Sequence, residues 1–415
     1  MLELLLCAPT LLVSPQDPDL AEVNRLAREI TARIEEVGGN TLTRMETLRA
    51  LDAEVAAQGE LLRQVVALHA MKHATELSNY AEALAFGDLT PPYSLPVSEE
   101  LAIALEQSEP QDAVEAIVRL AEDEVLVLVN EAHHVPQHRA LTLELLHALR
   151  EQGFTHFAAE TISDKDTELA ERGYPSSATG AYVDEPLCAD LVRTALALGY
   201  EIVAYESLGA DRELGQATNL LARTLEIDEH ARVLVHAGYA HINETGEVAG
   251  SRAMAGRVKE ITGIDPLTID QTLMTEHSER RLEHPLYRRI LEDLELERPT
   301  IFVGEKGRAW TAEPGVRDVT VFSPRSVLEH GRPTWLRMNG LRGPFLLPDD
   351  VLQGNDAVQV EVWPEQEPDG AVPIDRVEVR AGDGPKALML ASGRYRMEVR
   401  SVEDEVLSRT TIELP

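Results

Sequence analysis

The sequence predicts an α/β protein with a mainly parallel sheet flanked by helices, an N-terminal helical region and a small C-terminal β-sandwich-like domain. Three observations predict this fold class. From Glu124 onward, short apolar runs alternate with segments of helical periodicity, as in βαβ units. Before residue 123 the periodicity is mostly helical. After residue 345, short alternating stretches separated by turns take over. We therefore expect three parts, residues 1–122, 123–345 and 346–415.

The first part is expected to be helical and carries no chemical motif. Apolar residues recur at helical spacing from Asp17 to Gly38, and the pattern continues from Thr41 to Phe86. A proline-containing loop follows at 87–96. Two short helices are expected over residues 98–105 and 111–122.

The extreme N-terminus leaves two localisations open. Residues 2–13 are apolar, but no Lys or Arg precedes them and Glu3 interrupts them, whereas a secretory signal has a positive start. One interpretation is an ordinary buried segment of a cytoplasmic protein. The other is a shortened export signal that directs the chain to the periplasm. No run of about 18 apolar residues occurs, so no transmembrane span is predicted.

Charge and composition restrict the partners. The chain has 72 acidic and 38 basic residues, a net charge of −34, and only 4% aromatic residues. This field repels polyanions, and few rings are available to stack on bases, so nucleic acid and anionic membranes are disfavoured. Cations or a neutral substrate are more compatible with this negative electrostatic field. Cys7 and Cys188 form neither a disulfide framework nor a thiolate zinc site. Nothing in the sequence indicates an oligomeric state.

The central element is a buried strand that ends in ionisable residues. The apolar run Val125–Val129 is typical of a strand inside a parallel sheet, and it is followed directly by Asn130-Glu131-Ala132-His133-His134. Parallel sheets bind ligands beyond the carboxyl ends of their strands. A carboxylate and two imidazoles at this position therefore predict a functional site.

Three further strand candidates end in similar residues. Residues 155–160 end in Glu160, residues 200–206 end in Glu206, and a strand that begins at Arg232 runs into His236 and His241. The ends of parallel strands share one edge of the sheet, so we expect these side chains to converge. A fifth strand is expected at 267–271, and two more at 300–303 and 318–322. The polar insertion 163–184 is long enough to be a lid or a binding loop. The helices expected within this part cover residues 139–152, 186–198, 212–225, 254–262 and 276–297.

The last part is expected to be a small antiparallel sandwich with no catalytic constellation. Its strands are expected at residues 357–362, 376–380, 387–390, 394–399 and 410–414.

The predicted set of side chains supports three kinds of chemistry. Neutral imidazoles and carboxylates bind a divalent metal such as Zn, Mn or Fe, which would acidify a water molecule. Without a metal, a Glu–His pair can activate water by general-base catalysis. Histidine can also be an axial ligand of haem iron.

Several motifs resemble the ChaN-like and erythromycin-esterase-like group of the Tiki/TraB superfamily. Its first motif is a strand ending in Gly-Glu-x-His or Gly-Glu-x-x-His, similar to residues 130–138 here. A second strand ends in Glu, as does Ala158-Ala159-Glu160, and a later Gly-x-x-His is matched by Gly238-Tyr239-Ala240-His241. The resemblance covers residues 120–275. Asn130 replaces the usual glycine. Because His133 and His134 are consecutive, either ring could correspond to the histidine of the motif.

The resemblance implies a catalytic α/β domain whose site contains Glu131, His133 or His134, Glu160 and His241. Members of the superfamily include metal-dependent proteases, esterases that open macrolide lactones, and haem-binding lipoproteins. The pattern through His138 is closer to the haem-binding branch, whereas the Tyr205-Glu206 strand end and the helix Arg212-Glu213…Gln216…Asn219…Arg223 are closer to the esterase branch.

The leading hypothesis is a hydrolase that acts on an ester, lactone or amide of a small-molecule or peptide substrate. Glu131 or Glu160 would be the general base or a metal ligand, and Arg212 would stabilise an oxyanion. The imidazoles would be metal ligands or proton carriers: His133, His134, His236 and His241. Two alternatives stay open, a haem- or metal-binding protein without turnover, with His138 as a haem ligand, and a scaffold that has lost its activity.

Overall fold

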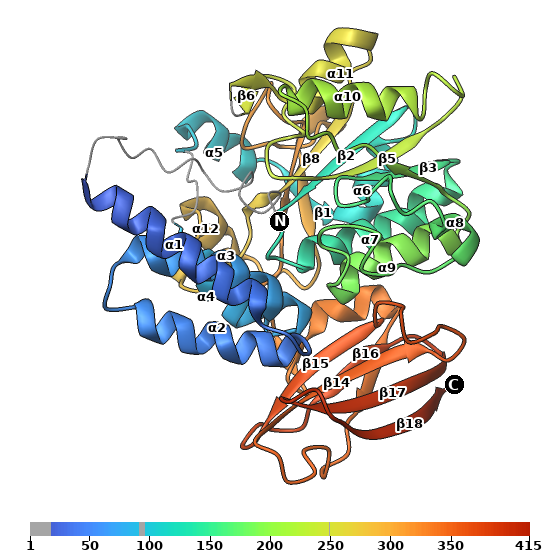
Figure 1. Cartoon of the computed structure of the whole chain (residues 1–415). Helices are drawn as coiled ribbons and strands as arrows, with labels where there is room; N and C mark the ends of the chain where they lie inside the picture. The colour runs from blue at the N-terminus through green and yellow to red at the C-terminus, as the bar shows by residue number, and fades with distance from the viewer. Residues whose placement is uncertain (1–17, 91–95, 249) are drawn as a thin grey trace.

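The structure is a computed structural model that describes residues 18–90, 96–248 and 250–415. A large, mostly parallel sheet forms its centre, with helices on both faces (Figure 1). A helical region lies at one side, and small antiparallel sheets near the C-terminus complete the chain. The predicted α/β fold class is confirmed. The export signal considered for residues 2–13 lies outside the described residues.

The central sheet has eight strands in the order β1-β9-β10-β8-β2-β5-β3-β4. The strands from β10 to β4 are parallel, whereas β9 and β1 pair antiparallel at one edge. All the strands predicted for this sheet are present. The bounds of the eight strands, including β1, which was not predicted, are β1 Glu109–Asp112, β2 Leu126–Glu131, β3 His156–Ala159, β4 Glu201–Ala204, β5 Val233–Gly238, β8 Leu267–Met274, β9 Thr300–Val303 and β10 Val319–Phe322.

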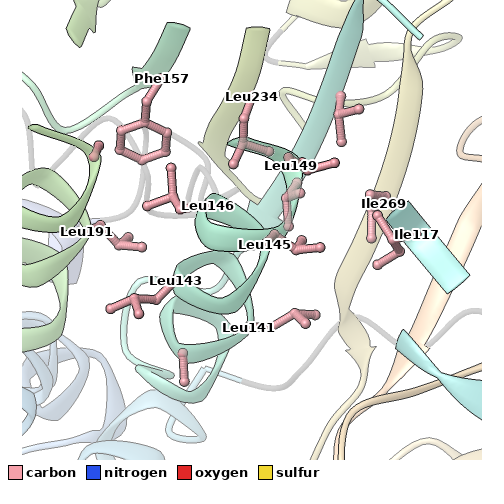
Figure 2. Close-up of a cluster of buried hydrophobic side chains, with 14 of the residues drawn as sticks. Ile117, Leu141, Leu143, Leu145, Leu146, Leu149, Phe157, Leu191, Leu234 and Ile269 are labelled. Atoms are coloured by element: carbon pink, nitrogen blue, oxygen red, sulfur yellow. The ribbon is translucent and has the colours of Figure 1, made fainter. Parts of the chain in front are cut away.

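Helices cover the two faces of this sheet in separate groups. On one face lie α6 (Ala113–Leu120), α7 (Gln137–Glu151) and α9 (Pro186–Ala197), and on the other lie α10 (Arg212–Ala222) and α11 (Met254–Thr262). The α7 helix carries a stripe of leucines that packs against the sheet and against α9 (Figure 2). This stripe fixes α7 next to β2, and the site described below depends on that placement.

Two predicted helices differ from the structure. The helix expected at 276–297 forms only at α12 (Pro285–Asp293), with a short 3₁₀ turn before it at Arg280–Leu282. Pro285 lacks an N–H and its ring clashes with a preceding turn, so the helix begins there and is capped by His284. The helix expected at 111–122 begins later, because residues 109–112 pair with β9 as strand β1.

The N-terminal helices pack against the C-terminal strands as well as against each other (Figure 1). The amide N–H of Leu42 donates to Gln359, and Arg49 pairs with Glu378. The pattern expected over residues 41–86 is divided into three helices. The bounds are α1 Pro18–Glu36, α2 Thr41–Val55, α3 Glu60–Glu76, α4 Tyr80–Gly87 and α5 Glu99–Glu106.

The C-terminal part is all-β, as expected. A four-stranded antiparallel sheet in the order β15-β14-β17-β18 shares a core with the antiparallel pair β13-β16. The bounds are β13 Gly343–Leu346, β14 Ala357–Pro364, β15 Asp375–Arg380, β16 Ala387–Leu390, β17 Gly393–Ser401 and β18 Val406–Leu414. Short elements join the larger ones: α8 Leu169–Arg172, β6 Glu247–Val248, β7 Ser251–Arg252, β11 Leu328–Glu329 and β12 Arg332–Pro333. Within the described ranges no helix combines the length and apolar character needed to cross a membrane.

Leu146 on α7 tests the importance of the leucine stripe. Its side chain is fully buried and points toward Phe157 (Figure 2). We expect Leu146→Ala to lower the free energy of unfolding by about 2–5 kcal/mol, because the substitution loses buried surface and leaves a cavity. Urea denaturation measures this, with Ile227→Ala as the control, since Ile227 is 77% exposed. Equal losses in both variants would contradict the proposed packing.

Candidate functional site

The ionisable residues predicted at the strand ends meet at one edge of the central sheet. Glu131 is the last residue of β2, Glu160 follows β3, and His236 lies within β5. Because β2, β5 and β3 are adjacent parallel strands, their carboxyl ends place these three side chains together. Glu206 follows β4, the next strand in the sheet. The predicted convergence is therefore present in the structure.

The Glu131 carboxylate is held by a buried arginine. Arg139 on α7 donates to both oxygens of Glu131, from Nε at 2.7 Å and from Nη2 at 2.8 Å. Its Nη1 donates to Glu185, the N-cap residue of α9, at 2.9 Å. Burial alone would raise the pKa of Glu131, but the positive charge of Arg139 and the interactions with His236 and His133 hold it well below its usual range. Glu131 therefore stays ionised although it is only 4% exposed.

Two imidazoles flank Glu131. His133 Nδ1 forms a hydrogen bond with Glu131 Oε1 at 2.8 Å, and His236 Nε2 lies 2.9 Å from Oε2. The other ring nitrogen of His236, Nδ1, is 3.1 Å from the hydroxyl of Thr142 on α7. A carboxylate at Nδ1 favours the tautomer of His133 that carries its proton there, so Nε2 is the nitrogen that can accept one.

A second acid–imidazole group lies around Glu160. Arg212, the first residue of α10, donates to Glu160 Oε1 at 2.7 Å and also pairs with Glu206. His241 Nε2 lies 3.6 Å from Glu160 Oε1 and 3.1 Å from Arg212 Nη1. His241 Nδ1 lies 2.8 Å from Oε1 of Glu213, which is buried. His241 thus repeats the arrangement of His133, with a buried carboxylate at Nδ1.

The electrostatics of this second group keep Glu160 ionised and favour the protonated form of His241. Burial raises the pKa of Glu160, but electrostatic interactions with His241, His133 and Arg212 and the hydrogen bond from the Gly238 amide lower it to about 2. Burial lowers the pKa of His241, yet Glu160 and Glu213 raise it above its ordinary value. An imidazole with a raised pKa keeps its proton to higher pH than a free imidazole does and can act as an acid.

The turn after β5 connects the two groups. The Gly238 amide donates to Glu160 Oε2, and the ring of His133 lies directly over this glycine, where a Cβ atom would be 2.6 Å from Cε1 and 2.7 Å from Nε2. Tyr239 has a φ of 44°, a left-handed conformation that is costly for a bulky residue. Tyr182 stacks on His133 at a centroid distance of 4.3 Å, and Tyr239 meets the same ring edge-on. The Gly-x-x-His segment therefore holds both groups in contact.

Two predicted histidines are not brought to this group. His134 turns away from Glu131 toward Gly87 and is influenced by Asp88 and His277, and burial lowers its pKa to about 4. His138 is fully buried, its Nδ1 accepts the amide N–H of Ala132, and burial lowers its pKa to about 3. Of the two consecutive histidines, His133 and His134, the structure therefore places His133 at the site.

The donor set does not fit a bound metal. Both oxygens of Glu131 are engaged by Arg139, and the oxygens of Glu160 by Arg212 and the Gly238 amide. Across the described part of the chain, no three His, Cys, Asp or Glu side chains are arranged as metal ligands. Carboxylates that are paired with guanidinium groups are poor ligands, because the metal would have to displace the arginines.

A cavity of about 430 Å³ opens beside Glu160. Glu160, Glu206, Arg212 and Tyr182 line it, together with part of the insertion that the sequence predicted to be a lid or binding loop. His133 contacts Tyr182, and His241 contacts Arg212 and Glu160, so both imidazoles adjoin the lining residues. A small ligand in this cavity can reach the second acid–imidazole group.

Comparisons with known proteins give only weak likenesses. No protein-family model matches the chain, and no curated protein matches it. Among solved structures, one titled as bacterial protein toxins is 21% identical over 48% of this chain and 43% of that chain, with a TM-score of 0.30. RRSP, a MARTX toxin effector domain from Vibrio vulnificus, is 17% identical over the same shares, with a TM-score of 0.27. The C-terminal region of Pasteurella multocida toxin, whose title describes a thiol-protease-like catalytic triad, is 12% identical over 86% of this chain and 54% of that chain, with a TM-score of 0.28. This chain thus spans about half the length of these solved chains, and such likenesses carry no functional argument.

Sequence reasoning missed three residues that organise the site: Arg139, Glu185 and Glu213. Each lies in a helix or at a helix end, where a charged residue usually faces solvent. The signal that could have found Arg139 is its distance from Glu131, eight positions along the chain, in a helix that starts just after the strand. Glu185 gave no comparable signal, and Glu213 was noticed only as part of a helix that resembles the esterase branch, without a site role.

Gly238 provides a test of the site geometry. We expect Gly238→Ala to displace the His133 ring and to lower the free energy of unfolding by about 1–3 kcal/mol, because the new methyl group overlaps the imidazole and approaches Glu160. Histidine NMR titration and chemical denaturation measure these effects. Gly370→Ala is the control, since nothing lies within 4 Å of the added atom. An unchanged His133 signal in Gly238→Ala would refute the close approach.

Proposed function

We propose that this chain is a hydrolase of an ester, lactone or amide. One observation carries the proposal: Glu160, at the wall of a cavity, lies between two imidazoles that are each held at Nδ1 by a buried carboxylate. Carboxylate–imidazole pairs of this kind orient a ring for proton transfer. Arg212 adds a fixed positive charge at the same wall.

The roles follow from the protonation of each group. Glu160 remains ionised and is a poor proton acceptor at neutral pH, so in this proposal it accepts a hydrogen bond from the attacking water. His133, with its tautomer set by Glu131, takes the proton from that water. His241, which carries a proton, donates it to the leaving oxygen or nitrogen. Arg212 stabilises the negative charge that develops on the carbonyl oxygen.

The chemical balance of this reaction is simple. The water oxygen forms a bond to the carbonyl carbon, and the bond from that carbon to the leaving oxygen or nitrogen breaks. One proton passes from water to His133 and one from His241 to the leaving group. Transfer of a proton from His133 to His241 through solvent restores both rings. The products are a carboxylic acid and an alcohol or amine, with no oxidant or cofactor required.

The resemblance to the ChaN-like and erythromycin-esterase-like group supports the same proposal. The positions that match its motifs, Glu131, His133, Glu160 and His241, lie in the two connected acid–imidazole groups, of which Glu160 lines the cavity. In this arrangement Glu131 acts through His133, as a positioning residue. We propose membership of that group together with the activity.

Substitution at the cavity wall tests the proposed activity. We expect His241→Asn and Glu160→Gln to lower kcat/KM on a panel of 4-nitrophenyl esters, lactones and anilides by about 10²–10⁴-fold, the usual contribution of proton transfer. His230→Asn is the control, because His230 is exposed and lies outside the site. Each assay is repeated with EDTA and with added Zn²⁺ or Mn²⁺, and we expect no change. Turnover that is equal in wild type and both site variants would remove these residues from the mechanism.

The pH profile tests the role of His241 as an acid. Its pKa is raised, so the active protonated form is present at low pH and is lost as pH rises through that pKa. Since Glu213 contributes to the raised pKa, we expect Glu213→Gln to move the alkaline limb of kcat/KM to lower pH. Glu226→Gln, at an exposed position, serves as the control. An alkaline limb that stays in place or moves upward would contradict this role.

A further inference from the structure

The cavity beside Glu160 has a charge balance unlike that of the whole chain. The chain has 72 acidic and 38 basic residues. The cavity is lined by four basic residues, Lys72, Lys165, Arg212 and Arg223, and by three acidic ones, Glu160, Asp164 and Glu206. A locally positive surface in so acidic a protein needs a specific explanation.

The acidic residues of the cavity are already paired. Glu160 and Glu206 both bind Arg212, and Asp164 lies 3.3 Å from Arg223. Lys72 also has carboxylate neighbours, Glu76 at 3.4 Å and Asp184 at 3.9 Å. Lys165 differs, because its side chain is exposed and its ammonium group forms no ion pair with any residue that the structure describes. The positive charge of Lys165 is therefore available to a ligand.

The basic residues stand at different distances from the reacting groups. Arg212 begins α10 and Arg223 is its C-cap, so the two backbone positions are separated by about 16 Å at 1.5 Å per residue. Arg223 donates to the carbonyl oxygen of Ala204 at the end of β4, which brings its guanidinium to the cavity. Its contact with Asp164 places it next to the segment that carries Lys165. Lys165 and Arg223 thus line the cavity from adjoining segments, while Arg212 belongs to the acid–imidazole group.

We propose that the substrate carries an anionic oxygen group, a carboxylate or a phosphate, which Lys165 and Arg223 bind while the scissile bond lies at Glu160 and Arg212. This inference rests on the proposed hydrolase function of the same cavity. Charge-assisted hydrogen bonds to ammonium and guanidinium groups are the strong contacts for such oxygens. Apolar lining residues suit the part of the substrate between its two ends: Ile162, Ala178, Ala181 and Leu208.

The overall charge of −34 makes these local cations important. It repels an anion at long range, and the sequence alone therefore favoured a cationic or neutral substrate. At short range the nearby basic residues dominate, because salt screens charges beyond about 8–10 Å. An anionic substrate is thus selected by the cavity and not by the field of the whole molecule.

A matched pair of esters tests the inference. We expect the full-length protein to hydrolyse 4-nitrophenyl hydrogen glutarate with a kcat/KM about tenfold above that for 4-nitrophenyl valerate, which lacks the terminal carboxylate. We expect Lys165→Ala to lower the glutarate value about five- to tenfold and Lys165→Glu to lower it further, with the valerate value unchanged. Lys306→Ala, which removes a lysine outside the cavity, is the control. Equal rates for the two esters, or no effect of Lys165→Glu on the glutarate ester, would overturn the inference.

A binding measurement separates this inference from the proposed function. Calorimetric titration of wild type and Lys165→Glu with glutarate and with inorganic phosphate measures anion binding without turnover. The anion that binds more tightly shows whether the site prefers a carboxylate or a phosphate. Anion binding that requires Lys165, without hydrolysis of either ester, supports the anion site and rejects the hydrolase. Hydrolysis that depends on Glu160 but has equal kcat/KM for the two esters, with no anion binding, rejects the anion site alone. Neither binding nor hydrolysis rejects both.

Discussion

The buried guanidinium of Arg139 joins the elements on which the site depends. It binds both oxygens of Glu131 at the end of β2 and also Glu185 at the start of α9, while its own backbone belongs to α7. Arg139 is 1% exposed, and an unpaired charge at such a position is strongly destabilising, by about 3–5 kcal/mol when a partner is removed. The relative positions of one strand and two helices are therefore fixed by the requirement to keep this charge paired. Glu131 is held in the orientation that places His133.

A consequence is that the site consists of two buried carboxylate–imidazole pairs with different partners. The first pair, Glu131 and His133, is fixed by Arg139, and the second pair, Glu213 and His241, contacts Arg212 and Glu160 at the cavity wall. Glu160 lies between them and is kept ionised by the cations around it. The two imidazoles are close to one carboxylate but differ in their surroundings, which is the condition for one ring to act as base and the other as acid.

The sequence was sufficient to predict the sheet and the convergence of Glu131, Glu160 and His241, because buried parallel strands have a strong apolar signal and their ends must share an edge. It was not sufficient for Arg139, since a charged residue on a helix has the same sequence pattern whether it faces solvent or a buried carboxylate. Nor could it choose between His133 and His134, which depends on the direction of the turn after β2. The extent of the helix predicted at 276–297 was wrong because amphipathic spacing outweighed Pro285 in the interpretation.

The turn at Gly238 and Tyr239 shows why the two pairs cannot be separated. The Tyr239 amide donates to the carbonyl oxygen of Glu131, and Asn130 donates to the carbonyl of Tyr239, so the ends of β2 and β5 are tied by backbone as well as side chains. This bonding holds Tyr239 at a positive φ that costs about 1–3 kcal/mol. The strained turn brings the Gly238 amide to Glu160 and directs the chain so that His241 returns to the same carboxylate. Asn130, where the resembling group has glycine, therefore takes part in fixing the turn that aligns the second imidazole with the first.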